Sequence, residues 1–128
     1  MTNFFNNIKY FIQRGKRGYA DCDLWDFDVY LAKTLTNALK DFKKINQGIA
    51  PNIYRKYINR KDLTQKQKDE LAKKEWNTIL DIMIRGFSIV PKLFEGKVLN
   101  NKILKEGYMY ELGIAFDFLK KYYFDLWD

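Results

Sequence analysis

Histidine is absent from this chain of 128 residues, and cysteine occurs only once, as Cys22. Without histidine the chain has no Ser-His-Asp triad, no Cys-His pair, no His-ligated zinc and no histidine proton relay. A single cysteine excludes an internal disulfide and any iron–sulfur or other site that needs several thiolates. We therefore expect a cytosolic protein that is not an enzyme and that has no catalytic residues, no metal site and no cofactor.

The chain also has few proline and glycine residues and no long hydrophobic run. Two prolines and seven glycines in the whole sequence favour long helices over many short strands and turns. No uninterrupted apolar run reaches the roughly 18 residues that a membrane-spanning helix needs. The first thirteen residues lack the charged start and the small-residue cleavage site of a signal peptide. These features predict a protein without a membrane partner.

What is present is enough apolar material for a packed core. Apolar residues make up 47% of the chain and charged residues 30%, which argues against disorder. The length fits one domain, residues 1–128. Helical spacing of apolar residues predicts a short N-terminal helix over about 3–13 and long helices over about 24–47, 65–87 and 104–127. The predicted fold is all-α, a compact bundle of three long amphipathic helices plus the short one.

Local signals support the ends and faces of these helices. Asp23 is a good N-cap for the second helix, and Thr64 followed by Gln67 forms a capping box before the third. One face of the third helix carries the predicted core stripe Ala72, Trp76, Ile79, Leu80, Met83 and Phe87. Residues 49–63 predict one or two helical turns, and residues 88–103 look irregular.

The last helix ends in a strongly aromatic tail. Its apolar stripe places Tyr123 and Leu126 in the core. Phe124 and Trp127 lie off that line and widen the apolar face. They fit either a role in closing the bundle against the N-terminal helix or a role in an interface.

Four aspartates surround Trp25: Asp21, Asp23, Asp26 and Asp28. Such a cluster could hold Mg²⁺ or Ca²⁺ through oxygen ligands, but capping and helix-dipole compensation explain acids at a helix start without any ion. An all-helical Mg-dependent nucleotide phosphohydrolase would need two pairs of acids on facing helices. Asp23 and Asp26 supply one such spacing, and no later acids supply the second.

Asp28 differs from its neighbours because it falls on the apolar stripe of the second helix. A carboxylate there is costly unless it is paired. We expect Asp28 to bind Arg14, Lys16, Arg17 or the loop backbone and so to fix the N-terminal helix, with an acid in a ligand pocket as the alternative. Structural roles are accordingly predicted for Asp23, Trp25, Asp28 and Trp76.

The positive charge lies in two segments. Residues 1–20 carry four basic and no acidic residues, and residues 49–75 carry eight basic and four acidic ones. Basic and aromatic side chains interleave in the second segment, a pattern that suits a phosphate backbone with stacked bases, although a solvated surface is the simpler interpretation. The candidate binding residues are Arg14, Lys16, Arg17, Tyr54, Arg55, Lys56, Tyr57, Arg60 and Lys61.

The run at residues 18–28, GYADCDLWDFD, resembles a small family of phage and prophage proteins with the pattern Gly-Tyr-x-Asp-x-Asp-x-Trp-x-x-Asp. The run from Trp76 to Phe87 and the closing aromatic helix look similar too, so the resemblance covers most of the chain. It implies a phage accessory protein and carries no catalytic residue over to this sequence.

Composition and resemblance together predict a phage-type accessory protein that acts by stoichiometric binding in the host cytoplasm. Its expected partner is a host protein or ribonucleoprotein complex, and inhibition of a host defence system such as a CRISPR effector fits this class. A nucleic-acid-binding module is the alternative, followed by a Mg-dependent nucleotide phosphohydrolase.

Overall fold

A computed structural model describes residues 3–127, and its regular structure over that range consists of α- and 3-10 helices with no strand. The all-α class predicted from the sequence is confirmed. The helices are α1 (Phe4–Arg17), η1 (Asp21–Leu24), α2 (Phe27–Ile45), α3 (Pro51–Ile58), α4 (Gln65–Ser88), η2 (Pro91–Phe94), α5 (Gly96–Leu99), α6 (Lys102–Tyr122) and η3 (Tyr123–Asp125).

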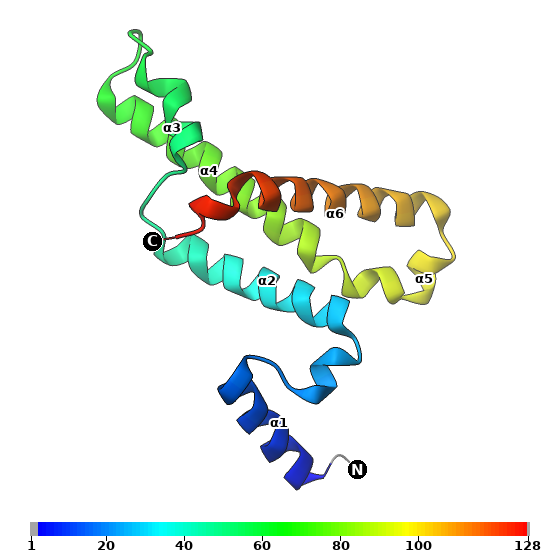
Figure 1. Ribbon diagram of the computed structural model, residues 1–128. Helices are drawn as coiled ribbons and strands as arrows, with labels where there is room; N and C mark the ends of the chain where they lie inside the picture. Colours follow the sequence, from blue (N-terminus) through cyan, green and yellow to red (C-terminus); the bar gives the residue numbers. More distant parts are fainter. Residues whose placement is uncertain (1–2, 128) are drawn as a thin grey trace.

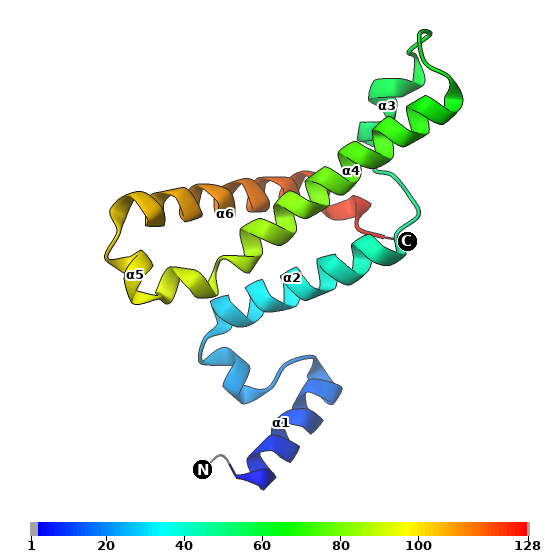
Figure 2. The same cartoon turned by 180° about the vertical axis from the view of Figure 1, so that it is seen from behind.

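Helix α4 is the centre of the molecule. Helices α2, α3 and α6 all pack against it, whereas α1 packs mainly against η1 (Figure 1). Seen from behind, α3 and the start of α4 project from one end of the α2–α4–α6 body, and α1 lies beyond α2 (Figure 2). The three long helices therefore form the body as expected, while the N-terminal helix stands apart from it. None of the helices formed by residues 3–127 is long and apolar enough to cross a bilayer.

The predicted stripe of α4 forms the core. Its six side chains are buried, with Trp76, Leu80 and Met83 fully so. The helix begins where the capping box predicts: Thr64 Oγ1 accepts from the Gln67 N–H at 3.2 Å, and the Thr64 N–H donates to Gln67 Oε1 at 2.9 Å. The structural role assigned to Trp76 agrees with this burial.

A buried amide ties three parts of the chain to the core. Asn46 follows α2 and is 6% exposed. Its Oδ1 accepts from Trp76 Nε1 at 3.1 Å, and its Nδ2 donates to the Trp127 carbonyl at 3.1 Å. Its own carbonyl accepts from Lys73 Nζ at 2.9 Å. Asn46 thereby fixes the end of α2 and the C-terminal tail against α4.

The prediction for the start of α2 is wrong. Asp23 lies inside η1 rather than at the N-cap of α2, and α2 begins at Phe27 with Asp26 as its N-cap residue. The intervening 3-10 turn changes which side chains face α4. The buried residues of α2 are Ala32, Thr36 and Leu39, whereas Leu31 is 44% exposed.

The aromatic tail also departs from the prediction. Helix α6 ends at Tyr122, which is buried, whereas Tyr123 is 61% exposed. Leu126 packs against the core as expected. Phe124 and Trp127 are exposed. The segment after α6 runs to the end of α2 that lies away from α1 (Figure 1), so it does not close the bundle against the N-terminal helix.

Candidate interaction surfaces

The side chains that the sequence nominates for binding lie on two separate elements. Arg14, Lys16 and Arg17 occupy the last turn of α1, and the group from Tyr54 to Lys61 lies on α3 and the loop after it. Figures 1 and 2 place these elements at opposite ends of the molecule, with α2 and α6 between them. The two basic segments therefore form two surfaces rather than one patch.

Residues 55–68, which we call the basic tip, form the projecting end of α3, the loop and the start of α4. They carry six basic residues and one acidic residue. Lys61 and Lys66 are exposed and have no ion-pair or hydrogen-bond partner among residues 3–127. Lys66 lies outside the group chosen from the sequence, because its position beside that group depends on the turn between α3 and α4.

The other cations of the basic tip stabilise its shape. Lys56 Nζ lies 2.6 Å from Glu75 Oε1, a contact that raises the pKa of the lysine. Lys68 Nζ donates to the Ile58 carbonyl at 3.0 Å. Arg60 forms a fork with Asp62, at 2.8 and 2.6 Å, which lowers the pKa of that carboxyl to about 2. Arg55 donates to Asn52 Oδ1 at 3.0 Å. Lys61 and Lys66 are left as the cations of the basic tip without a hydrogen-bond or ion-pair partner among residues 3–127.

Tyr54, which directly precedes the basic tip, and Tyr57 within it lie at the base of the projection. Both rings are half-buried and pack against the core cluster. The Tyr54 hydroxyl accepts from Gln65 Nε2, and the Tyr57 hydroxyl donates to Glu75 Oε2 at 3.3 Å. The exposed surface of the tip is therefore formed by its basic side chains rather than by free aromatic faces.

At the other end of the molecule, two aspartates hold α1. Asp23 Oδ1 and Oδ2 accept from the Arg14 guanidinium at 2.7 and 3.0 Å, and Oδ2 also accepts from the Ala20 N–H at 2.8 Å. Asp21 pairs with Arg17 and exchanges two 2.9 Å hydrogen bonds with Gln13. These bonds, with Gln13 the larger influence, lower the pKa of Asp21 to about 2, and Arg14 likewise lowers the pKa of Asp23.

The predicted role of Asp28 is thus filled by other acids. Arg14 and Arg17 pair with Asp23 and Asp21, while the exposed Asp28 accepts from the Val29 N–H at 2.9 Å. The prediction is wrong because α2 begins after η1, which turns Asp28 away from α1.

Gly18 and the aromatic residues near it complete this junction. Gly18 ends α1 in the left-handed region, at φ 86°, where a residue without a Cβ avoids steric cost. Its carbonyl accepts from the Tyr30 hydroxyl at 2.6 Å. The Arg17 guanidinium lies over the Tyr19 ring, 4.4 Å from the centroid. Trp25, which is 73% exposed, meets Tyr10 edge-on with centroids 6.2 Å apart. Residues 18–28 thus act as a clamp on the polar face of α1.

This clamp leaves the apolar face of α1 open. Gln13, Arg14 and Arg17 lie on the helix face opposite the apolar residues, since the two groups are offset by about half a turn. None of the α1 side chains is buried. The exposed apolar face consists of Phe4, Phe5, Ile8, Phe11 and Ile12. Sequence periodicity identified this face but gave no sign that it stays uncovered.

The aspartates around Trp25 do not form a metal centre. Within residues 3–127 there is no group of three cysteine, histidine or acidic residues placed to hold an ion. Asp21 and Asp23 instead neutralise arginines, whereas the sequence predicts helix capping and dipole compensation for the cluster.

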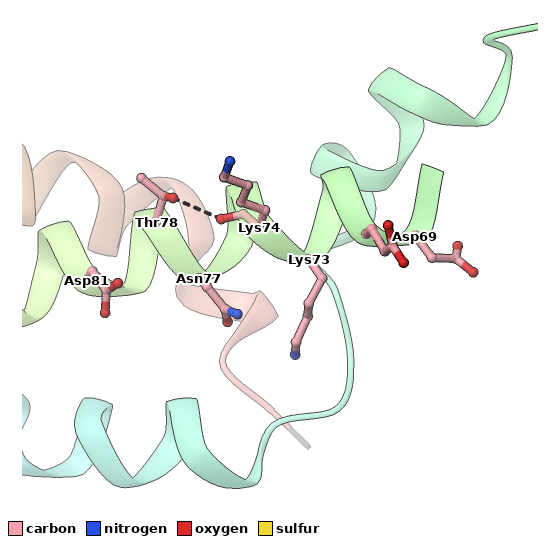
Figure 3. Close-up of a pocket in the computed structure, with 7 residues that line it drawn as sticks. Asp69, Lys73, Lys74, Asn77, Thr78 and Asp81 are labelled. Atoms are coloured by element: carbon pink, nitrogen blue, oxygen red, sulfur yellow. Dashed lines mark hydrogen bonds between the residues drawn. The ribbon is translucent and has the colours of Figure 1, made fainter. Parts of the chain in front are cut away.

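A shallow charged depression of about 610 Å³ runs along α4, where Asp69, Lys74 and Asp81 are part of its wall (Figure 3). Two of its charged groups, Lys73 and Asp81, bind other parts of the chain. Lys73 reaches from α4 to the chain after α2, donating to the carbonyls of Asn46 and Gly48. Asp81 pairs with Lys43 at 2.6 Å. The depression lacks a cluster of free polar groups converging on one point.

Comparisons with known proteins give no match: no family model, no curated protein and no solved structure resembles this chain.

Proposed function

We propose that this protein acts by stoichiometric binding and that the basic tip is its contact surface. The observation that carries the proposal is the placement of six cations and one acid on a projecting end of the molecule. Lys61 and Lys66 have no partner in the described chain, so their charge is available to a ligand. A projecting surface of this kind fits an anionic groove on another macromolecule.

The partner in this proposal is a host protein or ribonucleoprotein complex that presents an acidic surface or its bound nucleic acid. The resemblance of residues 18–28 to phage and prophage proteins supports an accessory role in a host cell. Antagonism of a defence system such as a CRISPR effector is a function that binding alone can perform. The basic tip would then contact the acidic or nucleic-acid part of such a complex.

The alternative is direct binding to nucleic acid, which the same charge favours. Phosphate contacts release condensed counterions, so this binding would weaken steeply as salt rises. Because the tyrosine rings of the tip are half-buried, the contact would be mainly electrostatic and nearly independent of sequence.

The experiment compares a tip variant with a control of equal charge change. Lys61→Glu/Lys66→Glu reverses the two free charges of the tip. Lys105→Glu/Lys120→Glu makes the same change at exposed positions of α6. Capture from a phage-host lysate should recover a protein or ribonucleoprotein with the wild type and the control, and lose it with the tip variant.

Nuclease treatment and a salt series separate the two functions. Capture that survives nuclease supports the protein partner, and anisotropy of labelled single-stranded RNA that falls with salt supports direct binding. If the tip variant and the control behave alike in both assays, the basic tip is not the contact surface.

A further inference from the structure

The body of the molecule has an apolar groove of about 380 Å³ near the start of α2. Helices α2 and α6 form its sides, and Phe87 of α4 with Val90 forms its floor. Besides Asp28 at its edge, every residue of the lining is apolar: Leu31, Ala32, Leu35, Phe87, Val90, Leu93, Phe94, Met109, Leu112 and Phe116.

This groove lies where a fourth helix would complete a bundle. Helices α2 and α6 both pack on α4, and the groove runs between them over the C-terminal part of α4. Several of its side chains remain unusually exposed for large apolar residues, among them Leu31 at 44%, Met109 at 49% and Phe116 at 53%. An amphipathic helix laid between α2 and α6 would cover them.

The same chain carries an amphipathic helix whose apolar face has no partner. The clamp around Asp21 and Asp23 binds the polar face of α1 and directs its aromatic residues outward. Phe5, Ile8 and Phe11 recur at the three-residue spacing that helix-in-groove contacts use. We propose that α1 of one copy docks in the groove of a second copy, and that the two copies exchange these helices reciprocally.

A second copy explains the geometry better than α1 of the same chain. Helix α1 lies beyond α2, on the side away from α6, in both views (Figures 1 and 2). To reach its own groove it would have to swing around α2. Exchange between copies keeps the contacts of Asp21 and Asp23 with α1 intact. By two-fold symmetry, each groove is then filled by α1 of the other copy.

The area is sufficient for a stable dimer. Phe4, Phe5 and Phe11 are 73%, 79% and 77% exposed. At roughly 200 Å² per phenylalanine they offer about 450 Å² of apolar surface on each α1. Complete cover of these rings on both helices, with an equal area from the two grooves, sets an upper limit of about 1,800 Å², against the roughly 1,200–2,000 Å² of a standard interface.

The first test is the mass in solution, measured by light scattering during size exclusion. The wild type should have twice the chain mass of 15.4 kDa. Phe5→Asp/Phe11→Asp on α1 and Met109→Asp in the groove should each give monomers, whereas Phe124→Asp, at an 87% exposed position elsewhere, should stay dimeric. All four residues are exposed, so the variants should fold, which circular dichroism checks.

The second test identifies which surfaces meet. In a Cys22→Ser background, one chain carries Phe11→Cys and a second chain, lengthened by a tag, carries Met109→Cys. Mild oxidation of the mixture should join the tagged and untagged chains. A monomeric wild type, a dimer insensitive to the α1 variant, or a disulfide that forms only when both cysteines are in one chain would overturn the proposal. So would a monomer that sediments with anionic vesicles, which would make α1 a membrane-surface helix. The basic tip is not involved, so neither result bears on the proposed function.

Discussion

At the scale of single residues, Asn46 has the largest structural role relative to its size. Replacing it with alanine removes the acceptor for Trp76 Nε1, which is fully buried and has no access to water. An unsatisfied buried donor costs roughly 1–3 kcal/mol. We expect Asn46→Ala to lower the free energy of unfolding by about 2 kcal/mol, measured by urea denaturation followed through tryptophan fluorescence.

A matched control is available on α2, the helix that Asn46 follows. Asn37 of α2 is exposed and makes no side-chain contact of this kind. Asn37→Ala should change the free energy of unfolding by less than about 0.5 kcal/mol. Equal changes in the free energy of unfolding for the two substitutions would show that the hydrogen bonds of the Asn46 side chain do not stabilise the fold.

The acids near α1 show what a sequence can and cannot settle at this scale. The sequence places four aspartates near Arg14 and Arg17, and the prediction that Asp28 is the one that fixes the N-terminal helix is wrong. Which acids pair with the arginines depends on the 3-10 turn η1, and the sequence has no strong signal for such a turn. Asp21 and Asp23 face the arginines because η1 precedes α2, and Asp28 does not.

At the scale of elements, two glycines with similar sequence context have opposite roles. A Cβ on Gly86 would lie 2.4 Å from the Ala115 Cβ and 2.8 Å from the Glu111 carbonyl oxygen, because α4 and α6 approach closely there. A Cβ on Gly113 would meet nothing within 4 Å. We expect Gly86→Ala to destabilise the protein by roughly 1–3 kcal/mol through overpacking, and Gly113→Ala to stabilise it by up to about 1 kcal/mol through helix propensity.

Thermal melts of the two variants test this contrast directly. Ala115→Gly, combined with Gly86→Ala, removes one of the two close contacts and should recover part of the lost stability. A stabilising effect of Gly86→Ala by itself would mean that α4 and α6 separate at little cost.

Helix α4 was predictable because its start and its face are both encoded locally. The capping box fixes Thr64 as the N-cap, and the stripe through Trp76 and Phe87 recurs at a regular helical spacing. The end of α6 was not predictable, because the consecutive aromatic residues Tyr122 and Tyr123 fit two adjacent faces of the helix equally well. The close approach at Gly86 was also missed, because it depends on which helix lies opposite.

At the scale of the whole molecule, amphipathic patterns predict that each helix has an apolar face but not what covers it. The apolar faces of α2, α4 and α6 meet one another, at least in part, around the α4 stripe. The face of α1 is as regular in sequence as theirs, yet the clamp at Asp21 and Asp23 turns it outward. Long-range packing of this kind has no local signal, which is why the short helix was expected inside the bundle.

The same arrangement predicts that the body folds without α1. The core cluster is built from α2, α3, α4 and α6 with the tail, and no residue of α1 belongs to it. A chain that starts at Asp26 should retain cooperative unfolding, with a free energy of unfolding within about 1 kcal/mol of the monomeric Phe5→Asp/Phe11→Asp variant. Circular dichroism melts at a low protein concentration measure this.

Melts at several protein concentrations separate folding from association in the comparison of the full chain with the chain that starts at Asp26. The melting temperature of the full chain should rise with protein concentration, because association through α1 stabilises the folded state by mass action. The chain from Asp26 onward should melt at one temperature at every concentration. Loss of the cooperative transition in the shortened chain would show that α1 stabilises the body of the same chain. The aromatic face of α1 would then be covered in solution rather than exposed.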